Sequence, residues 1–277
     1  MTINCKGTLI DFTVPKIMGI LNLSPDSFYD GGKYKEDSGI LAQVEKMLKE
    51  GATFIDMGAY SSRPGAEHVP ENEELKRLIP IITLILKQFP EAIISVDTFR
   101  SKVASESLAH GAALINDISA ANLDSKILDI VAQYQVPYIM MHLKGTPQSM
   151  QKQAVYDDLL KDLLFYFSKK VNETTSKKIN DVIIDPGFGF AKTTGQNYEL
   201  LNHLDLFKTF KAPIMIGLSR KSMIYKILKS TPKEALNGTT ALHTVALLKG
   251  ANILRVHDVK EAYECVNLIE ELKANSQ

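Results

Sequence analysis

Eight short apolar runs, each closed by a polar residue or a turn, constrain this chain more than any other feature of its sequence. Built mostly from Val, Ile, Leu and Met, they have the continuous apolar character of strands buried on both faces, as in a parallel sheet. The runs are Ile17–Asn22, Phe54–Gly58, Ile93–Asp97, Leu114–Ile118, Tyr138–His142, Val182–Asp185, Ile214–Gly217 and Ile253–Val256. Longer segments with apolar residues at helical spacing, such as Glu74–Lys87, Asn197–Leu204 and Val259–Lys273, separate them.

Strands and helices therefore alternate along the chain, which predicts parallel strands joined by right-handed helical crossovers. An open doubly wound sheet and a closed barrel both have this pattern, but eight units in about 260 residues favour a (β/α)8 TIM barrel. Residues Ile3–Phe12, with Gly7 in a turn position, predict a short N-terminal β-hairpin at the barrel bottom. Because no linker or repeat interrupts the pattern, residues 1–277 are predicted to form a single α/β domain.

Composition excludes several classes of protein. Lys+Arg and Asp+Glu both number 32, so the chain lacks the basic excess of a nucleic-acid binder. Two cysteines, Cys5 and Cys265, cannot build a disulfide framework or a cysteine zinc site. The first residues lack a signal-peptide pattern, and the apolar stretch Leu78–Leu86 is too short to cross a membrane. We therefore expect a cytoplasmic protein that acts on small molecules, without nucleic-acid or membrane partners.

Polar residues at the ends of the eight runs should meet at one mouth, because the carboxyl ends of barrel strands share one face. Three of them, Asp97, Asn116 and Asp185, are rich in hydrogen-bond acceptors. Such a set suits a ligand with several N–H donors, for example an aminopyrimidine ring, and Lys221 supplies a donor nearby. An Asp or Asn after a strand is also a common helix cap, and only the convergence of several favours a site.

A second set of residues near the strand ends consists of hydrogen-bond donors. It contains Ser62, Arg63, Arg255 and His257. Arginine forks match phosphate oxygens, so this set predicts an anion site for phosphate or diphosphate. An ion pair inside the barrel is the alternative for Arg255. The long loops 22–32 and 59–66 are candidate lids, and segment 185–190, with alternating Gly and Phe, suits a flat ligand.

The motifs at these strand ends together resemble those of the dihydropteroate synthase family. The resemblance extends over nearly the whole chain, in the order found in that family. The matching segments are 17–28 (IMGILNLSPDSF), 55–58 (IDMG), 61–65 (SSRPG), 95–98 (SVDT), 115–118 (INDI), 141–147 (MHLKGTP), 184–190 (IDPGFGF), 219–222 (SRKS) and 255–258 (RVHD).

This resemblance implies a magnesium-assisted condensation of 6-hydroxymethyl-7,8-dihydropterin diphosphate with 4-aminobenzoate, which yields 7,8-dihydropteroate and diphosphate. The implied pterin residues are Asp97, Asn116, Asp185, Lys221, Phe190 and Asp56. The implied diphosphate residues are Asn22, Ser62, Arg63, Arg255 and His257. The implied aminobenzoate residues are Phe28, Pro64, Phe190, Lys221 and Ser222. Asn22 would bind Mg²⁺, helped by Asp30, and the catalytic residues would be Arg63, Lys221, Arg255 and His257.

A dissociative, SN1-like displacement fits these groups, because cations would stabilise the leaving diphosphate while carboxylates would favour a positively charged dihydropterin. The resemblance further implies a homodimer and competitive inhibition by sulfonamides, which are similar to aminobenzoate. The chain departs from the family at Tyr60, where a carboxylate is usual, and at Lys144, where Arg is common. Any loop-closing ion pair made by a carboxylate at position 60 is therefore absent.

Three other functions compete with this interpretation. A pterin-binding methyltransferase domain has the same kind of barrel and acidic pocket. It needs neither the loop that begins at Asn22 nor the cluster of Arg63, Arg255 and His257, so these residues distinguish the two functions. A Schiff-base aldolase would use Lys221, whose neighbour Arg220 would lower its pKa. A non-enzymatic pterin-binding or scaffold protein would release no diphosphate from a pterin substrate.

Overall fold

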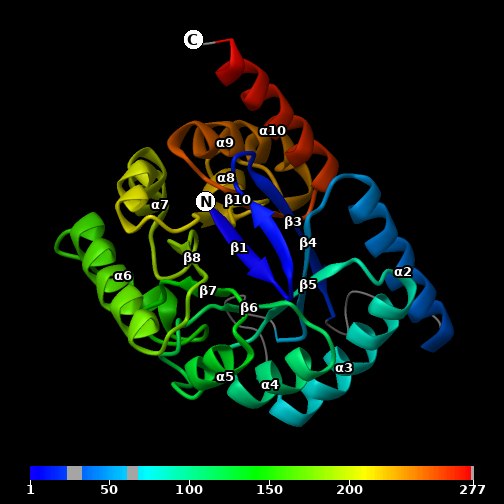
Figure 1. The fold of residues 1–277 in the computed structure, drawn as a ribbon. Helices are drawn as coiled ribbons and strands as arrows, with labels where there is room; N and C mark the ends of the chain where they lie inside the picture. Colours follow the sequence, from blue (N-terminus) through cyan, green and yellow to red (C-terminus); the bar gives the residue numbers. More distant parts are fainter. Residues whose placement is uncertain (24–32, 61–67, 276–277) are drawn as a thin grey trace.

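Eight parallel strands surround the centre of the molecule and alternate with helices (Figure 1). The computed structural model describes residues 1–23, 33–60 and 68–275. The barrel strands are β3 (Lys16–Asn22), β4 (Phe54–Gly58), β5 (Ile93–Asp97), β6 (Leu114–Asp117), β7 (Tyr138–Met141), β8 (Val182–Asp185), β9 (Met215–Ile216) and β10 (Ile253–Val256). The predicted (β/α)8 barrel is thus confirmed.

Hydrogen bonding runs in the order β8-β7-β6-β5-β4-β3-β10-β9, and every neighbouring pair is parallel. A single parallel bridge between Ile184 and Ile214 joins β8 to the start of β9 and nearly closes the ring. β9 has two residues where the sequence predicted Ile214–Gly217, because its pairing with β10 extends over Met215 and Ile216 only. The predicted strands Leu114–Ile118 and Tyr138–His142 each end one residue earlier than expected.

Helices cover the outside of the barrel, as Figure 1 shows. They are α2 (Lys33–Lys49), α3 (Glu71–Gln88), α4 (Ser101–Ala109), α5 (Ile127–Tyr134), α6 (Leu159–Ser176), α7 (Thr194–Asn202), α8 (Ser222–Tyr225), α9 (Leu236–Lys249) and α10 (Val259–Ala274). Short 3₁₀ helices are η1 (Met150–Gln153), η2 (Leu204–Phe210) and η3 (Pro232–Glu234). In the described part of the chain, no helix is both long and apolar enough to span a membrane.

The N-terminal hairpin lies across the barrel in Figure 1 and closes its bottom, as predicted. Strands β1 (Thr2–Cys5) and β2 (Thr8–Asp11) pair antiparallel around a two-residue turn. Lys6 and Gly7 both have positive φ angles in this turn, which is the geometry that matches the twist of two paired strands. Ile3, Cys5 and Ile10 of the hairpin are buried against the first layer of side chains inside the barrel.

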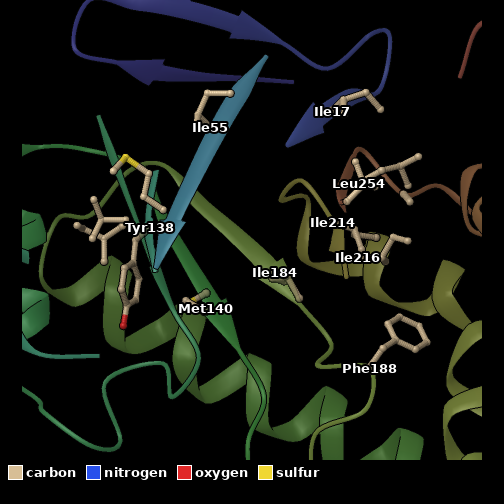
Figure 2. Packing of buried hydrophobic residues seen from close by; sticks show 14 of the residues in the cluster. Ile17, Ile55, Tyr138, Met140, Ile184, Phe188, Ile214, Ile216 and Leu254 are labelled. Carbon is tan, nitrogen blue, oxygen red and sulfur yellow. The ribbon is translucent and has the colours of Figure 1, made fainter. Parts of the chain in front are cut away.

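A larger apolar layer fills the space between the strands and the helices. Figure 2 shows part of it, with Ile17 of β3, Ile55 of β4 and Leu254 of β10 among the labelled residues. These side chains are at most 1% exposed. Alternate residues of the same strands point into the barrel instead, since successive side chains of a strand face opposite sides.

This alternation places a polar layer above an apolar one inside the barrel. Apolar residues at the amino ends of four strands belong to the buried cluster beneath the hairpin, and the residue two positions later is polar in each strand. The pairs are Phe54 and Asp56 in β4, Leu114 and Asn116 in β6, Ile183 and Asp185 in β8, and Ile253 and Arg255 in β10. The fold thus brings polar groups from distant parts of the chain to one level of the barrel.

Candidate active site

Strand register places the acceptor residues beside one another. Asp97 of β5 pairs with Asn116 of β6, and Asp56 of β4 pairs with Ser95 of β5. Asp56 is fully buried and accepts hydrogen bonds from the Ser95 hydroxyl at 2.5 Å and from Asn116 Nδ2 at 3.2 Å. Its hydrogen bonds therefore orient the neighbouring polar groups at the floor of the mouth.

Arg255 joins the predicted acceptor and donor sets directly. Its Nε donates to Asp56 Oδ2 at 2.6 Å, and its Nη2 donates to Asp97 Oδ2 at 2.8 Å. The guanidinium comes from β10 and the two carboxylates from β4 and β5. The curvature of the barrel therefore brings the three side chains into contact. The alternative considered for Arg255, an ion pair inside the barrel, is therefore present in the structure, and the same contact brings the two sets together.

Burial and charge shift the pKa values of these groups in opposite directions. Burial raises the pKa of Asp97 to about 7, although the positive charge of Arg255 opposes the shift. Burial also raises the pKa of Asp185, against the opposing charge of Lys221. For Arg255, burial acts to lower the pKa, but Asp56 and Asp97 outweigh it and the pKa rises above its usual value. The mouth thus contains a permanent cation and carboxyl groups that titrate closer to neutral pH.

The turn after β8 positions Asp185. Its Oδ1 accepts a hydrogen bond from the backbone N–H of Gly187 at 2.8 Å. Gly187 has φ +76°, and a Cβ atom there would lie 2.4 Å from the carbonyl oxygen of His142. Glycine is required at this position on both grounds, because other residues disfavour that φ and the backbone of β7 leaves no room.

Lys221 lies at the amino end of α8 and reaches across to this turn. Its Nζ donates to the carbonyl oxygen of Phe188 and lies 4.7 Å from the centre of the Phe190 ring. Burial lowers the pKa of Lys221 to about 8, although Asp185 opposes the shift. The predicted pair of Lys221 and Phe190 is therefore brought together, with Ser222 the next residue in the chain.

An apolar wall adjoins these polar groups. Ile118, Met141 and Leu143 form a buried cluster with Met150 and Ala191, and the partly buried rings of Phe99 and Phe190 pack on it. Met141 is the last residue of β7, and the others follow β5, β6, β7 and β8, so all of them lie on the carboxyl side of the barrel. Apolar surface next to a few oriented polar groups is the usual composition of a small-molecule site.

His257 lies just after β10, close to Ser219 after β9. The His257 Nδ1 and the Ser219 hydroxyl oxygen are 3.1 Å apart, and the same oxygen accepts from the backbone N–H of His257 at 3.3 Å. Arg220 points elsewhere, to Asp258, to which its Nε and Nη2 donate at 2.7 and 2.9 Å. Its guanidinium therefore fixes the loop before α8 to the end of β10.

Asn22 ends β3 at the same face of the barrel. Within the described residues, no group of three or more His, Cys, Asp or Glu side chains is suited to a metal ion. An amide oxygen at this face fits Mg²⁺, because this ion binds oxygen ligands, keeps several waters and takes few ligands from protein when substrate phosphates supply the rest.

Part of the predicted site falls outside the described residues. This applies to four residues assigned to the site, to Asp30 and to most of the two candidate lid loops. The four residues are Phe28, Ser62, Arg63 and Pro64.

Sequence reasoning missed a buried cation beside the predicted site, Lys192. It is 4% exposed and lies 3.2 Å from His142 Nδ1, measured from its Nζ. The available signal was its place directly after the Gly- and Phe-rich segment that carries Asp185. Burial lowers the pKa of Lys192 to about 7 and that of His142 to about 2.

Tyr60, which stands where a carboxylate was expected, takes part in a different set of contacts. Its hydroxyl accepts from Gln148 Nε2 at 2.8 Å, and its ring meets that of Phe99 edge to face at 5.1 Å. Arg100 lies 5.3 Å from the ring centre and pairs with the buried Glu74. The tyrosine thus links the segments after β4, β5 and β7 without a charge.

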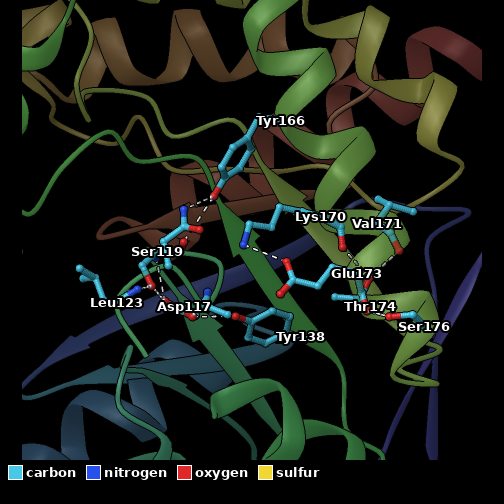
Figure 3. Close-up of polar contacts among 12 residues, drawn as sticks. Asp117, Ser119, Leu123, Tyr138, Tyr166, Lys170, Val171, Glu173, Thr174 and Ser176 are labelled. Carbon is cyan, nitrogen blue, oxygen red and sulfur yellow. Dashed lines mark hydrogen bonds and ion pairs between the residues drawn. The ribbon is translucent and has the colours of Figure 1, made fainter. Parts of the chain in front are cut away.

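Asp117, the neighbour of Asn116, faces away from the mouth because successive residues of β6 point to opposite sides. Its Oδ2 accepts from the Tyr138 hydroxyl at 2.6 Å and from the backbone N–H of Ala121 at 2.7 Å, and its Oδ1 accepts from Ser119 (Figure 3). The carboxylate therefore stabilises the turn after β6.

Comparison with known proteins finds relatives that match over nearly the whole chain. Residues 18–257 match a family described as pterin binding enzyme. The chain is 40% identical over 272 residues to dihydropteroate synthase of Escherichia coli K12, covering 98% of this chain and 96% of that protein. It superposes with a TM-score of 0.92 and 39% identity on Yersinia pestis dihydropteroate synthase in a sulfonamide drug complex, covering 99% and 100% of the two chains. For Xanthomonas albilineans dihydropteroate synthase with 4-aminobenzoic acid, the TM-score is 0.91, with 35% identity and 99% and 98% coverage.

Proposed function

Because this chain belongs to the dihydropteroate synthase family, we propose that the polar groups at the mouth of its barrel hold a pterin diphosphate and release diphosphate to an arylamine. The chain is a transferase of folate biosynthesis, which condenses 6-hydroxymethyl-7,8-dihydropterin diphosphate with 4-aminobenzoate. The observation that carries the assignment of the site is the position of Arg255, bonded to Asp56 and Asp97 at the level where Asn116 and Asp185 also lie.

The pterin ring is held by Asp97, Asn116 and Asp185, with Lys221 as a donor. A carboxylate accepts two adjacent N–H groups, which matches an amino group next to a ring N–H. The inward direction of Asn116 and Asp185 and their burial support this role. Phe190 covers the ring on the side of Lys221, while Asp56 acts at the pterin through its hydrogen bonds to Asn116 and Arg255.

The diphosphate is held on the cationic side of the mouth. Arg255 and His257 contribute from β10 and the residue after it, and Ser62 and Arg63 contribute from the segment after β4. Asn22 would hold Mg²⁺, which would supply positive charge to the leaving group. Together these groups stabilise the negative charge that develops as the C–O bond breaks.

Bond breaking precedes bond formation in the proposed reaction. The electron pair of the C–O bond leaves with diphosphate, and the positive charge on the methylene carbon spreads into the dihydropterin ring. The carboxylates Asp97 and Asp185 favour that charge. The arylamine nitrogen of aminobenzoate then attacks the carbon and loses a proton to solvent. Because a neutral arylamine is already nucleophilic, no strong general base is required.

Aminobenzoate binds beside Phe190, Lys221 and Ser222. The family resemblance assigns Phe28 and Pro64, which lie outside the described residues, to the same substrate. Sulfonamides share its shape and its arylamine, so they compete for the same place. Steady-state kinetics check this: inhibition by a sulfonamide should be competitive against aminobenzoate, and non-competitive inhibition would contradict the pocket assignment.

A second copy of this chain covers the exposed apolar face of α9 and α10. These helices pack together and expose four large aliphatic side chains, Val245, Leu248, Leu268 and Leu272. Leu268 is 73% exposed, and exposed apolar surface is a common feature of protein interfaces. A homodimer buries this face, and light scattering of Leu248→Glu and Leu268→Glu variants should report monomers where the parent protein is dimeric.

We further infer that residues 1–277 act as one domain and that the enzyme is cytoplasmic.

A diphosphate-release assay tests the whole assignment. Release should require the pterin diphosphate and Mg²⁺ and should be accelerated by 4-aminobenzoate. The order of bond changes is tested by replacing aminobenzoate with arylamines of different basicity. A maximal rate that is insensitive to arylamine basicity supports the dissociative step, and a steep dependence refutes it. No release with all components present would refute the proposed use of the site.

A further inference from the structure

The buried ammonium of Lys192 donates all of its hydrogen bonds to the turn that carries Asp185 and to the residue that follows β7. Its Nζ donates to the carbonyl oxygen of Gly187 at 3.0 Å and to that of Phe190 at 3.2 Å. The third contact, at 3.2 Å, is to Nδ1 of His142, at the end of β7. An ammonium has three N–H donors, so these three acceptors use them all.

His142 can accept this hydrogen bond because it stays neutral. Burial, helped by the charge of Lys192, lowers the pKa of His142 to about 2, so the ring carries no charge near neutral pH. Its Nδ1 is then the acceptor and its proton lies on Nε2. The backbone N–H of His142 also donates to the carbonyl oxygen of Asp185 at 3.1 Å. Lys192 and His142 therefore fasten the turn to β7 from both of its ends.

The turn itself needs such anchoring, because three of its residues have positive φ angles. These are Gly187 at +76°, Gly189 at +80° and Ala191 at +47°. Glycine adopts such angles readily, but an alanine keeps a positive φ only where neighbouring contacts hold it. Asn197 Oδ1 accepts from the N–H of Gly189 at 2.7 Å, and two ammonium groups donate to the turn: Lys221 to the carbonyl oxygen of Phe188, and Lys192 to those of Gly187 and Phe190.

We propose that Lys192 is a positioning residue for the pterin: its ammonium fixes the turn 186–191 and supplies charge that keeps Asp185 a hydrogen-bond acceptor. This proposal rests on the assignment of Asp185 to the pterin. Lys192 does not touch the reacting atoms of the substrate. It acts through Asp185 and Phe190. A buried cation next to a carboxylate favours the ionised form of that carboxylate.

The charge of Lys192 has only a modest effect on the pKa of Asp185. Lys192 is one of several charges acting on Asp185, so its removal raises the pKa of Asp185 without abolishing ionisation. The other cations that face Asp185 are Lys221 before α8 and Arg255 on β10. The charged groups that face Lys192 are Asp185, Lys221 and Lys144, and the neutral ring of His142 also contacts it.

Two substitutions separate the hydrogen bonds of Lys192 from its charge. Lys192→Met removes both, whereas Lys192→Gln keeps two N–H donors and removes the charge. The matched control is Lys170→Met on α6, where a lysine with 13% side-chain exposure loses its ion pair with Glu173. Binding of 6-hydroxymethylpterin, measured by calorimetry, reports on the pterin side of the site without the diphosphate.

Lys192→Met should weaken pterin binding about tenfold or more, as expected for losing hydrogen bonds from a charged donor. Lys192→Gln should have a smaller effect, and Lys170→Met none. With the pterin diphosphate, KM for that substrate should rise while kcat and the KM for aminobenzoate change little. In both Lys192 variants the pH below which pterin affinity falls should be higher than in the parent, because the pKa of Asp185 is raised. A loss of stability alone would not produce this shift.

A double variant with Asp185→Asn makes the test decisive. Without the carboxylate, Lys192 has no ionised group to support, so Lys192→Met should cost less affinity in that background than in the parent. Folded Lys192 variants with parental affinity and an unshifted pH dependence would refute the proposal, and so would additive losses. If Asp185→Asn itself binds pterin normally, the pterin assignment fails and the Lys192 proposal with it. If Lys192→Met does not fold, Lys192→Gln carries the same test.

Discussion

Replacing Arg255 with Met should destabilise the protein strongly, and more so at high pH than at low pH. The guanidinium is the counter-charge of Asp56, which is fully buried, and of Asp97, whose side chain is 15% exposed. Removing one member of a buried ion-pair cluster leaves uncompensated charge, and such changes cost about 3–5 kcal/mol. The same truncation of Arg77, which pairs with Glu73 on the surface of α3, should cost no more than about 1 kcal/mol.

The pH dependence follows from Asp97. Its pKa in the folded protein is raised to about 7, so its contribution to stability is present at low pH and is lost as the pH rises through that value. Arg255 lowers this pKa, and without Arg255 it rises further. Each unit by which the pKa of Asp97 rises in the variant destabilises the folded state by about 1.4 kcal/mol, once the pH exceeds that raised pKa. At about pH 6 Asp97 is protonated in both proteins, and the difference between them is smallest there.

Urea unfolding of the two proteins at a series of pH values measures this difference. The double variant Arg255→Met, Asp97→Asn should recover part of the lost stability at high pH, because the uncompensated carboxylate is gone. A destabilisation that is equal at low and high pH would refute the electrostatic reasoning. A loss no larger than that of Arg77→Met would show that the cluster contributes little to stability.

Three further predictions concern single residues of the barrel. Asp185→Asn should raise KM for the pterin diphosphate with little change in KM for aminobenzoate, because one acceptor becomes a donor; equal effects on both constants in a steady-state assay would contradict this. Tyr138→Phe should lower the free energy of unfolding by about 1–3 kcal/mol, since it removes the 2.6 Å hydrogen bond to the buried Asp117; urea unfolding with an unchanged midpoint would be the contrary result. Gly187→Ala should cost about 2 kcal/mol or more and also weaken pterin binding, because its Cβ meets the carbonyl oxygen of His142 at a positive φ; normal stability and affinity would exclude the proposed need for glycine.

The architecture was predictable because its signal is local. A run such as Ile93–Asp97 is apolar enough to be buried on both faces, and Gly7 marks the turn of a hairpin with apolar residues on either side. Strand limits were less predictable: β9 has two residues rather than the four of Ile214–Gly217, because hydrogen-bonding partners, and not the apolar run, decide where a strand ends.

The sequence also determined which residues end the strands, and so which ones a barrel must bring to its mouth. Asp97, Asn116, Asp185 and Arg255 follow from the pattern of apolar runs alone. The family motifs at the same positions determined the class of reaction. These inferences succeed because the direction of a parallel strand fixes which end of it faces the mouth.

Only the tertiary structure decided which of these groups touch one another. Asp56 and Arg255 are 199 residues apart in the chain, and their contact exists because β3 separates β4 from β10 by one strand in the closed ring. The same holds for Lys192, a lysine like many others in the sequence until the barrel packs it against β7 and the turn after β8. Burial and neighbouring charge depend on the whole fold, and they set the pKa values and pairings that local sequence does not contain.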